Sequence, residues 1–173
     1  ATVSGGYALL VDDGEIDAAR AASLLADGRS ALRRDDPREA ERLLTKSLAL
    51  WRGEPLVDVR YARFAQAEIA RLDELRLSTV EERNDAQLRL GEHALLVPEL
   101  EQQVRDQPFR EHLRGQLMLA LYRSGRQADA LAAYQSAREA LDERGLEPSR
   151  ELRDLERSIL NQDSELDSTF SPH

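Results

Sequence analysis

The feature that most constrains this chain is a run of 29 residues, 62–90, that contains neither Gly nor Pro. The run, ARFAQAEIARLDELRLSTVEERNDAQLRL, is rich in Ala, Leu, Glu and Arg, which lose little side-chain freedom in a helix. Its apolar residues recur close to every 3.6 positions, which is the period of an amphipathic helix. The sequence therefore predicts one long helix over 62–90, ended by Gly91, along which the other elements pack.

Pro and Gly residues divide the rest of the chain into six further predicted helices. Pro37 favours the first turn of a helix, whereas Gly125 and Gly145 follow the last turns of two others. Ser149 is a favourable N-terminal cap for the last helix. With the long helix included, the predicted helices cover residues 17–34, 37–50, 62–90, 92–107, 109–124, 127–144 and 149–161.

The same spacing of residues recurs in three predicted helix pairs, with small residues at several positions of the first and last pairs and a weaker copy in the second. The steps are seven, five and seven residues in each pair: Gly28, Asp35, Ala40 and Ser47; Asn84, Gly91, Leu96 and Gln103; Met118, Gly125, Ala130 and Ala137. Aligning them gives 34-residue units at 21–54, 77–110 and 111–144, with an insertion of 22 residues after the first. A 34-residue helix–turn–helix repeat is typical of tetratricopeptide proteins. The alternative is an unrelated helix bundle in which this spacing is coincidental.

The predicted fold class is therefore all-α, a tetratricopeptide-like repeat of about seven helices: three helix pairs and a capping helix. Residues 2–12 alternate apolar with small or polar side chains around Gly5-Gly6, which favours a short β-hairpin or half of one. The alternative for this segment is a frayed terminus. Residues 162–173 are acidic and aperiodic, and we expect them to be disordered.

Composition excludes several classes of protein. The chain has no Cys, so it has neither a disulfide framework nor a Cys-based zinc site. No apolar run reaches the roughly 18 residues of a membrane span, and the cytoplasm is the expected location. The net charge of −9 argues against binding of the chain alone to nucleic acid or anionic membranes.

A search for catalytic chemistry gives no candidate residues, and we expect the chain not to be an enzyme. His93, His112 and His173 lack metal-ligand spacing, and no phosphate-binding Gly-rich motif occurs. The sequence predicts no metal or other cofactor. Glu81 and Asp85 lie one helical turn apart, but surface acidity is a better explanation for them than acid–base catalysis.

Three long segments resemble the bacterial transcriptional activation domain of the Streptomyces antibiotic regulatory protein family. They are FAQAEIARLDELRLSTVEERNDAQLRLGEH (64–93), QPFREHLRGQLMLALYRSGRQADALAAYQSAREAL (107–141) and GLEPSRELRDLERSIL (145–160), and LWRGEPLVDV (50–59) is similar to the family as well. The resemblance assigns residues 15–161 to this domain. In the family this domain follows a winged-helix DNA-binding domain. The segment TVSGGYALLVD (2–12) resembles the closing strands of that winged helix, so residues 1–14 are expected to be a remnant of its hairpin or a linker.

The resemblance implies a regulatory and oligomerising module of a transcriptional activator. Such a module positions an attached DNA-binding domain, contacts DNA only through that domain, helps to engage RNA polymerase and forms a homodimer. The alternatives are a peptide-binding repeat scaffold in another pathway, or a ligand-sensing domain with a small molecule in its groove. The tetratricopeptide pattern places eight residues toward the concave groove, as a candidate surface for a polypeptide or an anionic partner: Arg29, Arg33, Glu81, Asp85, Arg89, His112, Tyr122 and Arg123.

Overall fold

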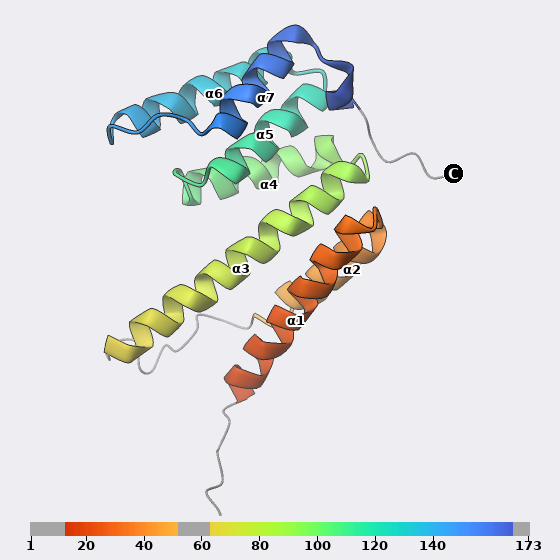
Figure 1. The fold of residues 1–173 in the computed structure, drawn as a ribbon, viewed down its shortest axis with the longest axis vertical. Coiled ribbons are helices and arrows are strands. Elements are labelled where there is room, and N and C mark those ends of the chain that lie inside the picture. Colours follow the sequence, from red (N-terminus) through yellow and green to blue (C-terminus); the bar gives the residue numbers. More distant parts are fainter. Residues whose placement is uncertain (1–12, 52–62, 168–173) are drawn as a thin grey trace, which may run out of the picture. The chain divides into compact units, whose positions relative to one another are not determined.

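The structure is a computed structural model that describes residues 13–51 and 63–167, and within these ranges it contains helices and no strands (Figure 1). The helices are α1 (Asp13–Arg33), α2 (Pro37–Leu48), α3 (Arg63–Arg89), α4 (His93–Asp106), α5 (Glu111–Arg123), α6 (Gln127–Asp142) and α7 (Arg150–Asn161), followed by the short 3-10 helix η2 (Ser164–Asp167). The predicted all-α class and the seven helices are confirmed. The expected hairpin over 2–12 lies outside the described residues.

The helix boundaries differ from the predicted ones by a few residues. Helix α1 begins at Asp13, four residues before the predicted start, because the acids at 13, 15 and 17 all suit a first turn and give no single start signal. Helix α5 begins at Glu111 rather than at residue 109. The chain turns at Pro108 first, and the Arg110 N–H donates to the Gln107 carbonyl at 3.1 Å.

Contacts divide the chain into two compact units, with the division at Val80–Glu81 inside α3. In the first unit α1 and α2 pack side by side as a helical hairpin (Figure 1). Gly28 is required there, because a Cβ atom at this position would lie 2.7 Å from the Leu44 side chain. Across the same helices the Ser47 hydroxyl, which is fully buried, donates to the Ala21 carbonyl at 3.0 Å.

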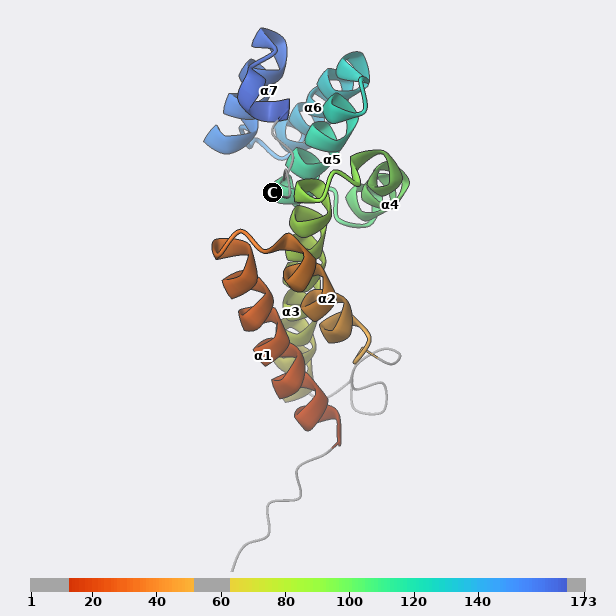
Figure 2. The ribbon, with the colours of Figure 1, turned by 90° about the vertical axis from the view of Figure 1, so that its right-hand side faces the viewer.

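In the second unit α5 packs between α4 and α6, and α7 packs on α5 and α6 (Figure 2). A Ser149 cap starts α7: its hydroxyl accepts a hydrogen bond from the Leu152 N–H at 3.3 Å. The core is formed by leucines, small residues and single larger side chains: Leu88, Leu96, Val97, Leu100, Leu117, Met118, Ala120, Leu121, Ala130, Tyr134, Ala137, Leu152 and Ile159.

The predicted repeat has a common structural basis in the three helix pairs. Asp35, Gly91 and Gly125 end the first helix of each pair with positive φ values of 58°, 83° and 76°. The backbone N–H of the residue after each of them donates a hydrogen bond to the carbonyl five residues earlier, which is the pattern of a Schellman C-terminal cap. At the next two repeat positions, Ala130 and Ala137 of the third pair are fully buried, as are Ala40 and Ser47 of the first.

The start of the expected disordered segment, 162–173, is ordered in the structure. Residues 164–167 form η2, and Leu166 packs against the core of the second unit. The Arg123 Nε donates to the Leu166 carbonyl at 2.6 Å. The sequence did not predict this short helix, because its contacts come from one apolar residue, Leu166, and one distant arginine, Arg123, and not from a periodic pattern.

Candidate functional site

The predicted groove residues do not fall into one unit of the structure. Arg29 and Arg33 lie on α1 in the first unit, and both are exposed. The other six belong to the second unit: Glu81, Asp85, Arg89, His112, Tyr122 and Arg123. Because six of the eight predicted groove residues lie in the second unit, the candidate site is described in that unit.

Glu81 is a buried ion-pair partner, contrary to the expectation that it is ordinary surface acidity. Its residue exposure is 8%, and Arg110 donates from Nε to Oε1 at 2.8 Å and from Nη2 to Oε2 at 3.0 Å. The two-pronged geometry matches a guanidinium to a carboxylate. Sequence spacing missed this pair because Arg110 lies 29 residues away, after another helix.

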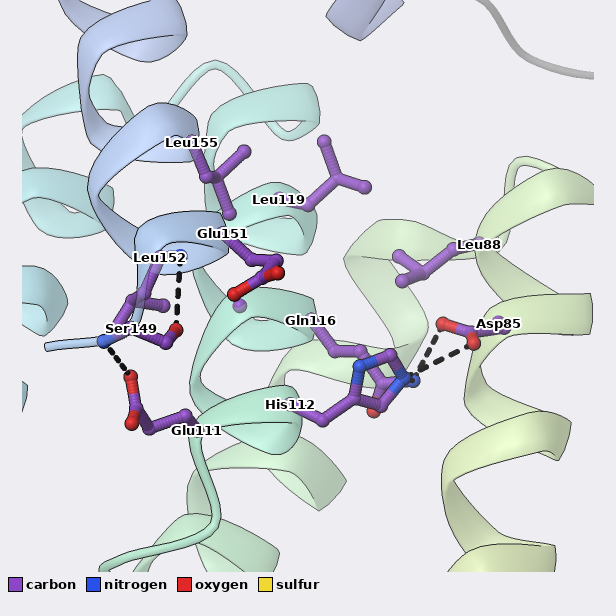
Figure 3. Close-up of a pocket in the computed structure, with 11 residues that line it drawn as sticks. Asp85, Leu88, Glu111, His112, Gln116, Leu119, Ser149, Glu151, Leu152 and Leu155 are labelled. Atoms are coloured by element: carbon purple, nitrogen blue, oxygen red, sulfur yellow. Dashed lines mark hydrogen bonds and ion pairs between the residues drawn. The ribbon is translucent and has the colours of Figure 1, made fainter.

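Asp85 organises a polar cluster with Gln116 and His112 (Figure 3). The Gln116 amide nitrogen donates to the Glu81 carbonyl at 2.7 Å and to Asp85 Oδ1 at 2.6 Å, which uses both of its hydrogens. Asp85 Oδ2 is a carboxylate oxygen and can only accept, so the His112 Nε2 carries a hydrogen and donates to it at 3.1 Å. Two of the predicted groove residues, Asp85 and His112, are thus brought together.

Tyr122 and Arg123, at the end of α5, are occupied by contacts within the unit. Tyr122 packs against the core. Arg123 donates from Nη1 to the Leu88 carbonyl at 3.0 Å, in addition to its bond to Leu166. Arg123 thereby joins the end of α3, the end of α5 and η2, so its contacts within the unit are structural.

A pocket of about 370 Å³ opens beside the Asp85–His112 pair, between residues 85–88 of α3, helix α5 and the start of α7 (Figure 3). Its lining holds no Lys or Arg and consists of Asp85, Leu88, Glu111, His112, Gly115, Gln116, Leu119, Ser149, Glu151, Leu152 and Leu155. Glu111 fixes one wall, because its Oε2 accepts the Ser149 N–H at 2.7 Å. Sequence reasoning missed the α7 wall because it assigned α7 only a capping role.

Gly115 forms part of the pocket floor, in the interior of α5. A Cβ atom there would lie 3.7 Å from Leu155 and 3.8 Å from Leu152, which is ordinary contact. We expect Gly115→Ala to raise the free energy of unfolding by about 0.5–1 kcal/mol, since Gly in a helix interior is less stable than Ala. Urea denaturation measures the change. Gly28→Ala is the matched control and should destabilise, because its Cβ meets Leu44 at 2.7 Å.

His112 and His93 are expected to titrate on opposite sides of the ordinary histidine pKa. The hydrogen bond to Asp85 raises the pKa of His112, with weaker contributions from the charges of Glu81 and Glu82, against the opposing effect of burial. Burial lowers the pKa of His93, the first residue of α4, and the charge of Arg123 adds to this. A pH titration of the ring protons by NMR should show His112 losing its charge at the higher pH.

The sign for stability follows from the His112 shift. Its folded pKa lies above the unfolded value, so the His112–Asp85 ion pair stabilises the chain fully below about pH 6.5 and this contribution disappears as pH rises through the raised pKa. His112→Asn should therefore destabilise the chain more at pH 5.5 than at pH 8 in urea denaturation. An equal loss at both pH values would contradict the predicted charge state. The His112 side chain is 54% exposed and the Asp85 side chain 30%, so water screens the pair and the difference is expected to be small.

Two classes of site are not found in the described part of the chain. No group of three or more His, Asp or Glu side chains there is arranged to hold a metal ion. None of the helices over the described ranges combines the length and apolar character needed to cross a membrane. The pocket beside the Asp85–His112 pair is a concave feature of the second unit that could serve recognition.

Comparison with known families identifies the helical repeat. The model of the bacterial transcriptional activator domain matches residues 16–160. The chain belongs to this family. The resemblance seen in the sequence is thereby confirmed, and the family is one of transcriptional activators rather than of enzymes.

The relatives of this activator domain are longer regulators. Over 167 residues the chain is 41% identical to the regulatory protein DnrI of Streptomyces peucetius, and it covers 61% of that protein. It is 43% identical over 164 residues to the regulatory protein AfsR of Streptomyces griseus, of which it covers 17%. In each case at least 94% of this chain is aligned.

A solved structure has the same fold. The structure of Mycobacterium tuberculosis EmbR in complex with a low-affinity phosphopeptide superposes with a TM-score of 0.86 at 31% sequence identity. The alignment covers 96% of this chain and 46% of that chain. The tetratricopeptide-like activator domain therefore corresponds to about half of a larger regulator in that protein.

Proposed function

We propose that this chain is the regulatory and oligomerising module of a bacterial transcriptional activator. It positions an attached DNA-binding domain on repeated promoter sites and helps to engage RNA polymerase in the cytoplasm. The observation that carries the proposal is the family match over residues 16–160. The DnrI and AfsR relatives, which are longer than this chain, support a module that works within a larger protein.

Charge supports a division of labour in which the attached domain, and not residues 15–161, reads DNA. The whole chain carries 33 acids against 24 basic residues, and from Arg138 onward it has ten acids and five arginines. Lys and Arg contacts to phosphates supply most non-specific affinity for DNA. Within the described residues of the second unit, the helices bury their apolar faces against one another in one core.

A promoter with direct repeats tests this division. We expect residues 1–173 alone to give no specific electrophoretic shift at near-physiological salt, and the same domain joined to its native upstream segment to give one. In vitro transcription with the joined protein should show activation that is lost when residues 15–161 are deleted. A specific shift by residues 1–173 alone, or full activation after the deletion, would contradict the proposal.

Oligomerisation has its own measurement. We propose a homodimer, and sedimentation of the joined protein should give a mass that doubles with rising concentration. A monomer mass over the whole range, together with unchanged promoter occupancy, would remove oligomerisation from the proposed function and leave activation to be judged by transcription.

A further inference from the structure

Gly115 lines the second unit's pocket, and the packing there leaves room for the methyl group of an Ala. Gly28 is needed because a Cβ would clash with Leu44, whereas a Cβ at Gly115 would meet only ordinary contacts at 3.7 and 3.8 Å. A helix-interior Gly sacrifices stability relative to Ala. Residues that break a local rule without a structural reason tend to lie at functional sites. Gly115 therefore marks a place where the chain keeps space open for another molecule.

The walls of this space combine apolar and acidic groups from three helices (Figure 3). Leu88 comes from α3, Leu119 from α5, and Leu152 and Leu155 from α7. The carboxylates are Asp85, Glu111 and Glu151; His112 pairs with Asp85, and no Lys or Arg lines the pocket beside the other two. The lining thus favours an apolar group that carries a positive charge.

The three carboxylates differ in how many hydrogen bonds they already accept from groups of this chain. Asp85 already accepts hydrogen bonds from His112 and Gln116, and Glu111 accepts one from the Ser149 N–H. Glu151, in the first turn of α7, is exposed and forms no ion pair within the described part of the chain. Glu151 is therefore the carboxylate best placed to pair with an incoming cation.

We propose that this pocket binds a polypeptide segment of a partner protein through an Arg or Lys side chain that lies next to an aliphatic one. The inference rests on the proposed function in taking the partner to be a protein. Helices α3 and α5 are the first helices of successive pairs, and first helices line the concave binding surface of helical repeats. The capping helix α7 adds the third wall beside them. A volume of about 370 Å³ is near the lower end of ligand pockets, which suits a few anchoring side chains rather than a whole helix.

The direct test uses two short capped peptides in which leucines flank a single arginine or, in the second peptide, a single citrulline, its neutral isostere. Binding to the whole chain is measured by fluorescence anisotropy at near-physiological salt. The arginine peptide should bind about tenfold more tightly, the ratio expected for one hydrogen-bonded charge. In NMR spectra of the labelled chain it should shift the amides of Gly115, Gln116 and Glu151. Equal affinities of the two peptides would overturn the proposal.

Matched variants separate the pocket from the general acidity of the chain. Glu151→Gln should lower the affinity for the arginine peptide by about two- to fivefold, which is the range expected for loss of an exposed ion pair. Glu139→Gln removes the same charge from an exposed position on α6 outside the pocket, and it should change nothing. Gly115→Leu fills the floor and should abolish binding, with thermal melting as the check that the variant is folded. Equal losses for Glu139→Gln and Glu151→Gln would show attraction to the surface as a whole and overturn the proposal.

Other occupants give different results in the same assays. If phenethylamine competes with the arginine peptide at equal concentration, the pocket takes a small amine and the polypeptide occupant is wrong. If the chain dimerises without peptide and Gly115→Leu makes it monomeric, a second copy fills the pocket and the proposal is likewise wrong. Promoter activation is a separate readout, because loss of activation on deleting residues 15–161 supports the proposed function whether or not the peptide binds.

Discussion

Arg110→Gln is expected to lower the free energy of unfolding by about 2–3 kcal/mol, because it leaves the Glu81 carboxylate buried without its ion-pair partner. The Glu81 side chain is 10% exposed and the Arg110 side chain 30%, so the pair is largely shielded from water. Removing one member of a shielded pair costs more than the pair contributes when both are present. Urea denaturation at neutral pH measures the loss.

Two further variants make the Arg110 result specific. Arg126→Gln removes an arginine that pairs with Asp129, and both side chains are about half exposed. Surface ion pairs contribute roughly 0–1 kcal/mol, so this change should lower the free energy of unfolding by less than about 1 kcal/mol. The double variant Glu81→Gln, Arg110→Gln should be less destabilised than the sum of its single changes, because no unpaired charge remains. Strict additivity would show that the two side chains do not interact in solution.

Ala130→Leu is expected to destabilise the chain by about 1–3 kcal/mol through overpacking where α6 packs in the core. Ala130 is fully buried, and it occupies the same repeat position as Ala40 in the first pair, which is also fully buried. The larger side chain has to push neighbouring atoms apart, because Ala130 is fully buried in a close-packed cluster of leucines, small residues and Tyr134. Thermal or urea denaturation gives the change in stability.

The matched control for Ala130 is Ala132→Leu, the same chemical change at an exposed position of α6. Gln135→Ala is a second control on the exposed face. Both should stay within about 0.5 kcal/mol of the parent chain. If Ala132→Leu destabilised as much as Ala130→Leu, the assigned face of α6 would be wrong.

The repeat and its helices are largely readable from sequence because their signals are local. The run 62–90 predicted α3 to within one residue at each end, since a long stretch of helix formers without Gly or Pro has no competing structure. The stops at Gly91 and Gly125 follow from the left-handed backbone that Gly adopts easily. Asp35 takes the same role without being a glycine, and only alignment of the repeat indicated it.

The candidate site was only partly readable, because its chemistry depends on residues far apart in the chain. The repeat pattern placed Asp85 and His112 in a common groove, and they form an ion pair. The same pattern counted several arginines as groove residues, yet Arg123 holds the Leu166 carbonyl and the pocket lining contains no arginine. Whether a charge is exposed or paired depends on its neighbours in three dimensions, which helical periodicity does not specify.

By itself, the amino-acid sequence determined the family, the all-α class and the positions of the turns, since these depend on residue type and on spacing within a few helical turns. Only the tertiary structure decided that Glu81 is buried against Arg110, that η2 is ordered and that α7 closes an acidic, leucine-lined pocket over Gly115. The first two features arise where segments separated by 29 and 43 residues meet, and the pocket brings together residues from Asp85 to Leu155. Such a contact between distant segments needs only one side chain from each segment. It therefore produces no periodic pattern from which it could be predicted.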